Sequence, residues 1–305
     1  MMVLFILRRL WLAALVCLTV LVVSFILTRL SGDLAASIAG PNASAADIAI
    51  ITKNYGLDRP LVVQFLEWAG HAAEGDLGRS FLYHAPVSGL IRDRLPVTLT
   101  LGLTGLSIAL LIGLPLGILA AVREGTAIDR GIMLVALLGQ AMPGFWFGLV
   151  MIVLLGLELQ WLPISGVETW QGYIMPGIVL AFSAIPALMH LTRSGMIDAL
   201  AADYIRTARA KGLSRTKIIL KHALRNAAMP VVSIAAVQLG FMLGGSVVTE
   251  SVFALPGVGY LAWESITKND FPVVQAVVLF LAVIYIALTL LADMMNALLD
   301  PRLRA

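Results

Sequence analysis

The hydrophobic pattern divides the chain into long apolar runs separated by short polar segments. The first run follows Arg8 and Arg9 and extends from Leu10 to about Thr28. The apolar core of a signal peptide is only about 7–15 residues long, whereas a helix needs roughly 20 residues to cross a bilayer. We therefore expect a retained first transmembrane helix. Five further spans are predicted at about residues 97–122, 131–157, 173–192, 229–249 and 273–299. This pattern is typical of an all-α integral membrane protein with six transmembrane helices.

The segment 30–95 contains no run long enough to span a bilayer. Helical patterning is present at 45–53 and 60–69, and Gly75-Asp-Leu-Gly78 reads as a turn. The predicted organisation is a short N-terminus with the first span (1–29), an outer region (30–95), a core of five spanning helices (96–300) and a short tail (301–305). A charged loop at 193–228 interrupts the core.

Lysine and arginine predict the orientation, because cytoplasmic loops of membrane proteins are enriched in positive charge. If the N-terminus is cytoplasmic, 14 of the 21 Lys and Arg residues fall on the cytoplasmic side. The loop at about 158–172 then lies outside and holds two acids and no base. We therefore expect both termini and the loop 193–228 in the cytoplasm.

The stretch 197–226 stands out because seven of the 21 Lys and Arg residues lie between Arg206 and Arg225. Two short helices are predicted here, separated by Gly212, which suits the left-handed position after a helix end. Ser214 is expected to cap the second helix. On the first helix, Ala201, Ile205 and Ala208 should form a narrow apolar face, and Arg206 and Arg209 a polar one. The second should carry a positive stripe of Lys217, Lys221 and Arg225 opposite Ile219, Leu220 and Ala223.

Composition narrows the possible chemistry. Hydrophobic residues make up 60% and charged residues 13% of the chain, against about 25% charged in soluble domains. The net charge of +3 is accounted for by cytoplasmic loops, and no basic stripe with interleaved aromatics predicts a nucleic-acid partner. No phosphate-binding loop of the G-x-x-x-x-G-K-[ST] type occurs. Energy for uphill transport would therefore have to come from another chain.

The predicted spans contain few polar side chains. Gln140, Gln238 and Gln275 are expected to hydrogen-bond between helices. The alternative is that Gln140 or Gln238 lines a translocation path. Cys17 is the only cysteine, and the four histidines are scattered, which predicts no bound metal and no catalytic residues. A secondary carrier, a channel or an integral membrane enzyme remain alternatives of other classes.

The stretch Tyr204-Ile-Arg-Thr-Ala-Arg-Ala-Lys-Gly212, followed by His222-Ala-Leu-Arg-Asn226, resembles the coupling loop of ABC-importer permeases. The general pattern is Glu-Ala-Ala, three residues, Gly, nine residues, then Ile-x-Leu-Pro. Ala208 and Gly212 match it, whereas Arg206-Thr207 replace Glu-Ala and Arg225 replaces Pro. With these departures, the loop resembles that of the first permease subunit of dipeptide, oligopeptide and nickel importers. Further segments that resemble this family are 56–68, 75–80, 94–100, 250–260 and 300–304.

The resemblance implies a type I ABC-importer permease in the bacterial inner membrane that carries di- or oligopeptides, or alternatively nickel complexes, glutathione or another small solute. Its implied partners are a second, homologous permease, two cytoplasmic ATPase subunits or domains that bind ATP and Mg²⁺, a periplasmic or lipid-anchored binding protein, and membrane lipid. No cofactor is expected in this chain, and it is not itself an enzyme. The implied ATPase-coupling residues are Asp203, Tyr204, Arg206, Thr207, Ala208, Arg209, Lys211, Gly212 and Leu213.

The last outer loop is a second candidate region. Ser251–Phe271 contains Pro256-Gly-Val-Gly259 and Phe271-Pro272, so it cannot form one continuous helix. It is either a plain surface loop or a gate or docking site for the binding protein. The candidate residues are Glu250, Pro256, Gly257, Gly259, Tyr260 and Trp263.

Overall fold

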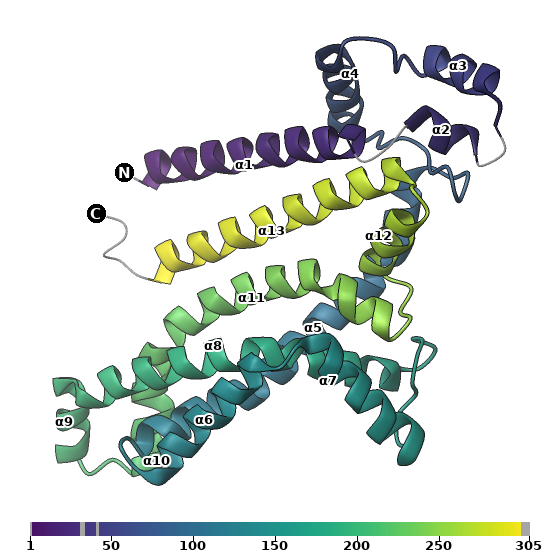
Figure 1. The fold of residues 1–305 in the computed structure, drawn as a ribbon. Coiled ribbons are helices and arrows are strands. Elements are labelled where there is room, and N and C mark those ends of the chain that lie inside the picture. The colour runs from purple at the N-terminus through teal and green to yellow at the C-terminus, as the bar shows by residue number, and fades with distance from the viewer. Residues whose placement is uncertain (1, 31–33, 41–42, 300–305) are drawn as a thin grey trace. The chain divides into compact units, whose positions relative to one another are not determined.

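The computed structural model describes residues 2–30, 34–40 and 43–299, and the regular elements in these ranges are helices (Figure 1). The predicted tail 301–305 lies outside them. The chain forms two compact units. The first unit comprises Leu99–Leu255 and the residues from Ala287 onward, and the second comprises Met2–Thr98 and Pro256–Ile286. Within the described residues, five helices are long and apolar enough to cross a membrane, and one bent helix pair is a sixth candidate span.

The first unit is built around α8 (Ile174–Ala201). This helix packs against α6 (Ala127–Ala141), α7 (Gly144–Met151) and α11 (Leu224–Val252). It follows a short 3₁₀ turn, η2 (Trp170–Tyr173). Both α8 and α11 extend beyond the predicted spans 173–192 and 229–249, because their polar ends continue as helix. Pro186 lies inside α8 and Pro230 inside α11, where neighbouring helices and side chains can satisfy the freed backbone groups.

The predicted span 131–157 is not one helix. α6 ends at Ala141, Met142 is extended at ψ 132°, and α7 continues as a π-helix, η1 (Ile152–Glu158). The two halves, Ala127–Ala141 and Gly144–Glu158, are bent by 97° relative to each other. Proline explains the break, because Pro143 forces the residue before it out of the helical region and has no N–H to donate.

α5 (Val87–Val122) approaches α8 closely at a glycine. An ideal Cβ on Gly117 would lie 2.7 Å from the Met189 carbonyl oxygen and 2.7 Å from the Thr192 Cβ. Because one of these atoms belongs to the backbone, it cannot rotate away. Small residues at helix contacts allow such approach within membranes, so Gly117 determines how near α5 lies to α8.

We predict that Gly117→Ala destabilises the chain by about 1–3 kcal/mol through overpacking. The matched control is Gly131→Ala, also within a helix, where a Cβ would meet nothing within 4 Å. That change should stabilise by about 0.5–1 kcal/mol, because alanine is the better helix former. Thermal unfolding in detergent micelles followed by circular dichroism measures both. Equal unfolding temperatures for the two variants would contradict the close approach.

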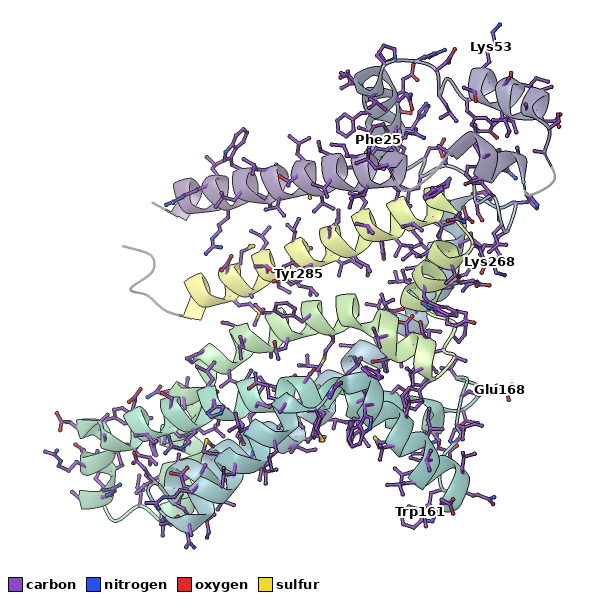
Figure 2. All side chains as sticks on the ribbon, viewed as in Figure 1. Phe25, Lys53, Trp161, Glu168, Lys268 and Tyr285 are labelled. Carbon is purple, nitrogen blue, oxygen red and sulfur yellow. The ribbon has the colours of Figure 1, made fainter. Side chains whose placement is uncertain are left out.

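The second unit contains α1 (Met2–Leu30), α2 (Leu34–Ala39), α3 (Ala45–Asn54) and α4 (Leu61–Ala73). It also holds the start of α5, α12 (Val258–Thr267) and the first half of α13 (Phe271–Leu299). α3 and α4 confirm the helical patterning at 45–53 and 60–69. Figure 2 shows Phe25 of α1 beside α4, where its ring lies 5.5 Å from Phe65 and 6.1 Å from Trp68.

Asp270, between α12 and α13, holds the loop after α4. Its carboxylate is 1% exposed and accepts hydrogen bonds from the Ser80 hydroxyl at 2.5 Å and from the backbone N–H groups of Phe81 and Leu82 at 3.1 and 3.2 Å. Nearby, the Tyr83 hydroxyl donates to Glu264. Burial and the Glu264 carboxylate raise the pKa of the Tyr83 phenol, so it remains a donor. The loop 77–84 is therefore fixed by side chains that lie almost 190 residues away in sequence.

Candidate functional site

The charged stretch identified in the sequence begins where α8 ends. Ala202 is extended, with φ −70° and ψ 151°, and α9 (Asp203–Ala210) starts immediately after it. Asp203 lies in the first turn of α9 and Arg209 in the last, and these charges suit the helix dipole at each end. α9 is therefore a separate short helix, although no proline or glycine separates it from α8.

One face of α9 is buried in a small apolar cluster. Ile205 is fully buried and Ala208 is 6% exposed. They pack with Met196 and Ala199 of α8 and with Ala227 of α11. The prediction that Ile205 and Ala208 form the apolar face is confirmed, whereas Ala201 is exposed. Residues of both long helices therefore contact the buried face of α9.

The opposite face of α9 is polar and exposed. Arg206 forms an ion pair of 3.4 Å with Asp203, and both side chains are more than 80% exposed. Of the nine predicted coupling residues, seven are exposed, whereas Ala208 is buried and Leu213 is half-buried against the cluster. The exposed ones are Asp203, Tyr204, Arg206, Thr207, Arg209, Lys211 and Gly212. The exposed residues therefore lie on α9 and on the turn that follows it.

The turn after α9 is a Schellman motif. Gly212 has φ +69°, as predicted, and its N–H donates to the Arg209 carbonyl at 3.0 Å. The Leu213 N–H donates to the Ala208 carbonyl at 3.3 Å. These are the two hydrogen bonds of the motif, and the contact of Leu213 with the cluster is its usual hydrophobic partner. Gly212 therefore fixes the direction in which the chain leaves α9.

The second predicted short helix is not separate from the membrane span. Ser214 caps α10 (Arg215–Lys217) by accepting the Lys217 N–H, as predicted. The helix continues through a π-helix, η3 (Ile218–Ala223), into α11. The buried residues are Ile218 and Ala223, five apart, and Leu220 is 55% exposed. Leu220, which was predicted on the apolar side opposite the positive stripe, does not belong to the buried face, because the wider π-helical turn shifts that face.

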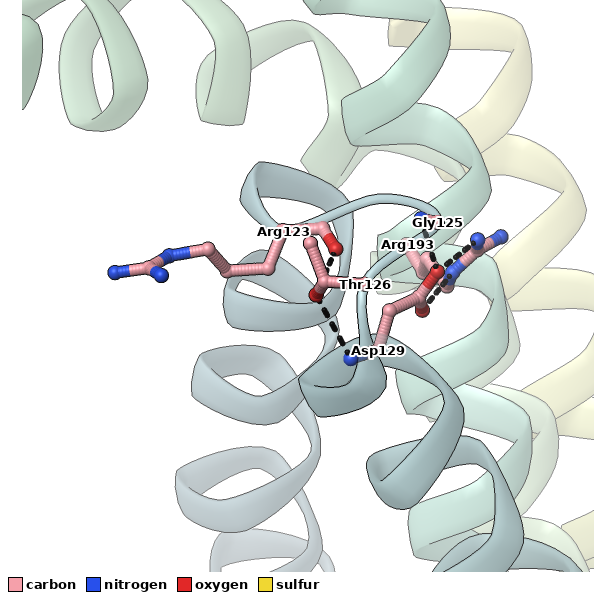
Figure 3. Close-up of polar contacts among 5 residues, drawn as sticks. All are labelled: Arg123, Gly125, Thr126, Asp129 and Arg193. Carbon is pink, nitrogen blue, oxygen red and sulfur yellow. Dashed lines mark hydrogen bonds and ion pairs between the residues drawn. The ribbon is translucent and has the colours of Figure 1, made fainter.

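An ion pair joins α6 to α8 in the same unit (Figure 3). Arg193 donates from Nε and Nη2 to the two carboxylate oxygens of Asp129, each at 2.7 Å. The Asp129 side chain is 5% exposed and also accepts the Gly125 N–H at 3.0 Å. Thr126 caps α6 by accepting the Asp129 N–H. Sequence reasoning did not find this pair, although Thr126-x-x-Asp129 has the spacing of a capping box.

The two glutamines predicted for a translocation path lie in different surroundings. Gln238 lines a pocket of about 320 Å³ between α7, α8 and α11, together with Phe145, Ser183 and Thr249. Gln140 is exposed, two residues before the bend, and does not line that pocket. The path assignment stays a prediction for both residues.

The six predicted outer residues are divided between the two units. Glu250 belongs to the first unit and is fully buried. In the second unit, Gly257 and Gly259 are buried, and Pro256 and Trp263 are exposed. The rings of Tyr260 and Trp263 lie 5.6 Å apart between centroids and are tilted by 40°. α12 is bounded by non-helical residues on both sides, so the expectation that 251–271 is not one helix is confirmed. The described residues hold no group of three His, Cys, Asp or Glu side chains that could bind a metal.

Two family comparisons cover most of the chain. Residues 113–305 match the binding-protein-dependent transport system inner membrane component. Residues 2–102 match the N-terminal part of the same kind of membrane component.

Known relatives agree with these matches. The chain is 42% identical over 275 residues, or 90% of each protein, to the glutathione transport system permease protein GsiC of Salmonella typhimurium. It is 39% identical over 98% of each chain to the oligopeptide transport system permease protein AppB of Bacillus subtilis. An inward-facing structure of the MetNI methionine ABC transporter shares the fold, with a TM-score of 0.58 at 19% identity, over 69% of this chain and 96% of that one. This chain therefore belongs to the inner membrane components of binding-protein-dependent transport systems and is a permease subunit of an ABC importer.

Proposed function

We propose that the chain imports short peptides, as one half of a translocation path completed by a second, related permease. A periplasmic or lipid-anchored binding protein delivers the substrate, and two cytoplasmic ATPase subunits or domains bind ATP and Mg²⁺ and supply the energy. Relatives named for glutathione, a tripeptide, and for oligopeptides support this substrate class. Nickel complexes and other small solutes are the alternative cargo, and the ligand retained by the partner binding protein distinguishes them.

The observation that carries the proposal is α9 with its Gly212 turn. α9 is amphipathic: its exposed face is cationic, and its other face is buried against α8 and α11. A partner that displaces α9 can therefore also displace these two spanning helices. ATP binding then biases a two-state equilibrium between inward- and outward-facing forms, and α9 transmits that bias. The proposed contact comprises Asp203 to Leu213.

A pocket beside α9 is suited to an acidic side chain of the partner ATPase. It encloses about 470 Å³ and is lined by Arg209, Arg215, Leu213 and Ile218, with no acidic side chain among its described lining residues. Two guanidinium groups at an apolar pocket suit a carboxylate flanked by apolar atoms, since arginine can bind carboxylates bidentately. We therefore assign Arg209 to the contact with the ATPase.

The test is a charge reversal in the assembled complex. Arg209→Glu should reduce substrate-stimulated ATP hydrolysis in proteoliposomes at least about tenfold, because like charges across an interface cost several kcal/mol. Arg225→Glu is the matched control, because this substitution changes the charge by the same amount. Arg225 is also exposed, and it lies outside this pocket. Equal activity of the two variants would contradict the assignment. Uptake by the chain without ATPase subunits would instead support a secondary carrier.

A further inference from the structure

A pocket of about 490 Å³ in the second unit is not accounted for by the translocation path or by α9. It lies between the last turn of α1, α2, α4, the loop 77–84 and the first turns of α13. Its walls combine cationic and polar side chains with aromatic ones. Those that matter here are Arg29, Arg79, His84, Gln275, Tyr55 and Trp68.

The polar side of this pocket offers hydrogen-bond donors and positive charge. Gln275 is 8% exposed, and its amide nitrogen has no hydrogen-bond partner within the described parts of the chain. The same holds for the buried Nε of Arg29. Arg79 donates to the His84 carbonyl at 2.8 Å, which holds a second guanidinium at the pocket without neutralising it. Because no described lining residue is acidic, the pocket suits an anion that accepts several hydrogen bonds.

The position of the pocket indicates which anion. Arg29 is in the last turn of the candidate span Leu7–Leu30, and Phe271 and Gln275 are in the first turns of Phe271–Met295. The pocket therefore lies at the depth where spanning helices leave the hydrocarbon layer and lipid headgroups begin. Aromatic side chains such as Trp68 and Tyr55 are typical of that interface. Ile26 and Leu30 of α1 are 45% and 78% exposed and apolar.

We propose that this pocket binds the phosphate headgroup of an anionic membrane phospholipid. The headgroup phosphate accepts hydrogen bonds from Arg29 and Gln275, and the acyl chains run along the apolar last turns of α1. A peptide carboxylate would satisfy the same donors. The two unpartnered donors, the depth of the pocket at the headgroup layer and the interfacial aromatic side chains together favour a lipid.

Binding of defined lipids to the purified full-length chain tests the proposal. Native mass spectrometry would compare phosphatidylglycerol with phosphatidylcholine of identical acyl chains. The wild type should bind phosphatidylglycerol at least about fivefold more tightly, and Arg29→Gln should lose about fivefold of that affinity, the effect of one cation near a lipid surface. Gln275→Leu should lose about two- to tenfold, as expected for one hydrogen bond.

Two further variants separate a specific effect from misfolding. Arg29→Lys keeps the charge and should keep most of the preference for phosphatidylglycerol. Arg92→Gln removes an exposed cation of the same unit that does not line the pocket, and should change binding less than twofold. Equal binding of both lipids by the wild type, or equal losses in Arg29→Gln and Arg92→Gln, would overturn the proposal. So would displacement of phosphatidylglycerol by dialanine or by inorganic phosphate alone, because the site would then bind peptide carboxylates or free anions.

Discussion

Replacing Gly212 by valine should abolish ATP-driven uptake and the stimulation of ATP hydrolysis, while the chain still inserts into the membrane. Gly212 has φ +69°, a region in which a β-branched residue is strained by about 1–3 kcal/mol. The turn relieves that strain by opening, which breaks the hydrogen bonds to Arg209 and Ala208 and removes Leu213 from the cluster under α9. Uptake and ATP hydrolysis measured in proteoliposomes of the assembled importer would show the loss.

A graded series identifies backbone strain as the cause. A Cβ at Gly212 would meet nothing within 4 Å, so side-chain volume should not matter. Asparagine tolerates the left-handed region, whereas alanine there costs about 1–2 kcal/mol. The expected order of coupled uptake is therefore Gly212→Asn above Gly212→Ala above Gly212→Val. If volume mattered instead, the larger asparagine would be worse than alanine.

The matched control lies at another left-handed glycine. Gly75 has φ +86° and also nothing within 4 Å of an ideal Cβ, but it belongs to the loop after α4. Gly75→Val should retain coupled uptake. Normal uptake in Gly212→Val, or equal loss in both variants, would contradict the role proposed for the α9 turn.

Local signals in the sequence predicted the local structure. The apolar runs located the candidate spans, and glycine with a following serine predicted both the Gly212 turn and the Ser214 cap. The break at Ala202 that separates α8 from α9 was not predictable in this way, because no proline or glycine lies there and Ile205 is buried only by packing against α8 and α11. The apolar side predicted at Ile219, Leu220 and Ala223 differs from the buried residues of η3, Ile218 and Ala223, because a 3.6-residue repeat does not describe π-helical turns.

Contacts between distant residues could not be predicted from the sequence. Asp129 and Arg193 lie 64 residues apart, and Ser80 and Asp270 lie 190 apart. Each of these side chains is unremarkable in its own segment, and only the packing of the helices makes it a partner. The bend at Pro143 was not predicted, because prolines also occur within continuous membrane helices, as Pro186 does in α8.

The Asp129–Arg193 pair should give the largest loss of stability among single polar substitutions in the first unit. Both hydrogen bonds are 2.7 Å long and the side chains are 5% and 26% exposed. Removing one partner of a buried pair leaves the other charge uncompensated. Arg193→Ala leaves the more deeply buried carboxylate and should cost about 3–5 kcal/mol. Asp129→Ala leaves a guanidinium that can partly reach solvent, and should cost less, about 2–3 kcal/mol.

A double-mutant cycle separates the pair from the packing of each side chain. The double variant Asp129→Ala/Arg193→Ala should lose less free energy of unfolding than the two single losses added together. The difference should be about 1–3 kcal/mol, since no unpaired charge remains. Arg193→Lys should be intermediate, because an ammonium cannot bind both oxygens in the fork geometry of a guanidinium. Chemical unfolding in detergent micelles measures all four. Arg206→Ala is the control, since its exposed pair with Asp203 should contribute less than about 1 kcal/mol. Strictly additive single losses would show that Asp129 and Arg193 act independently, and that the pair does not hold α6 against α8.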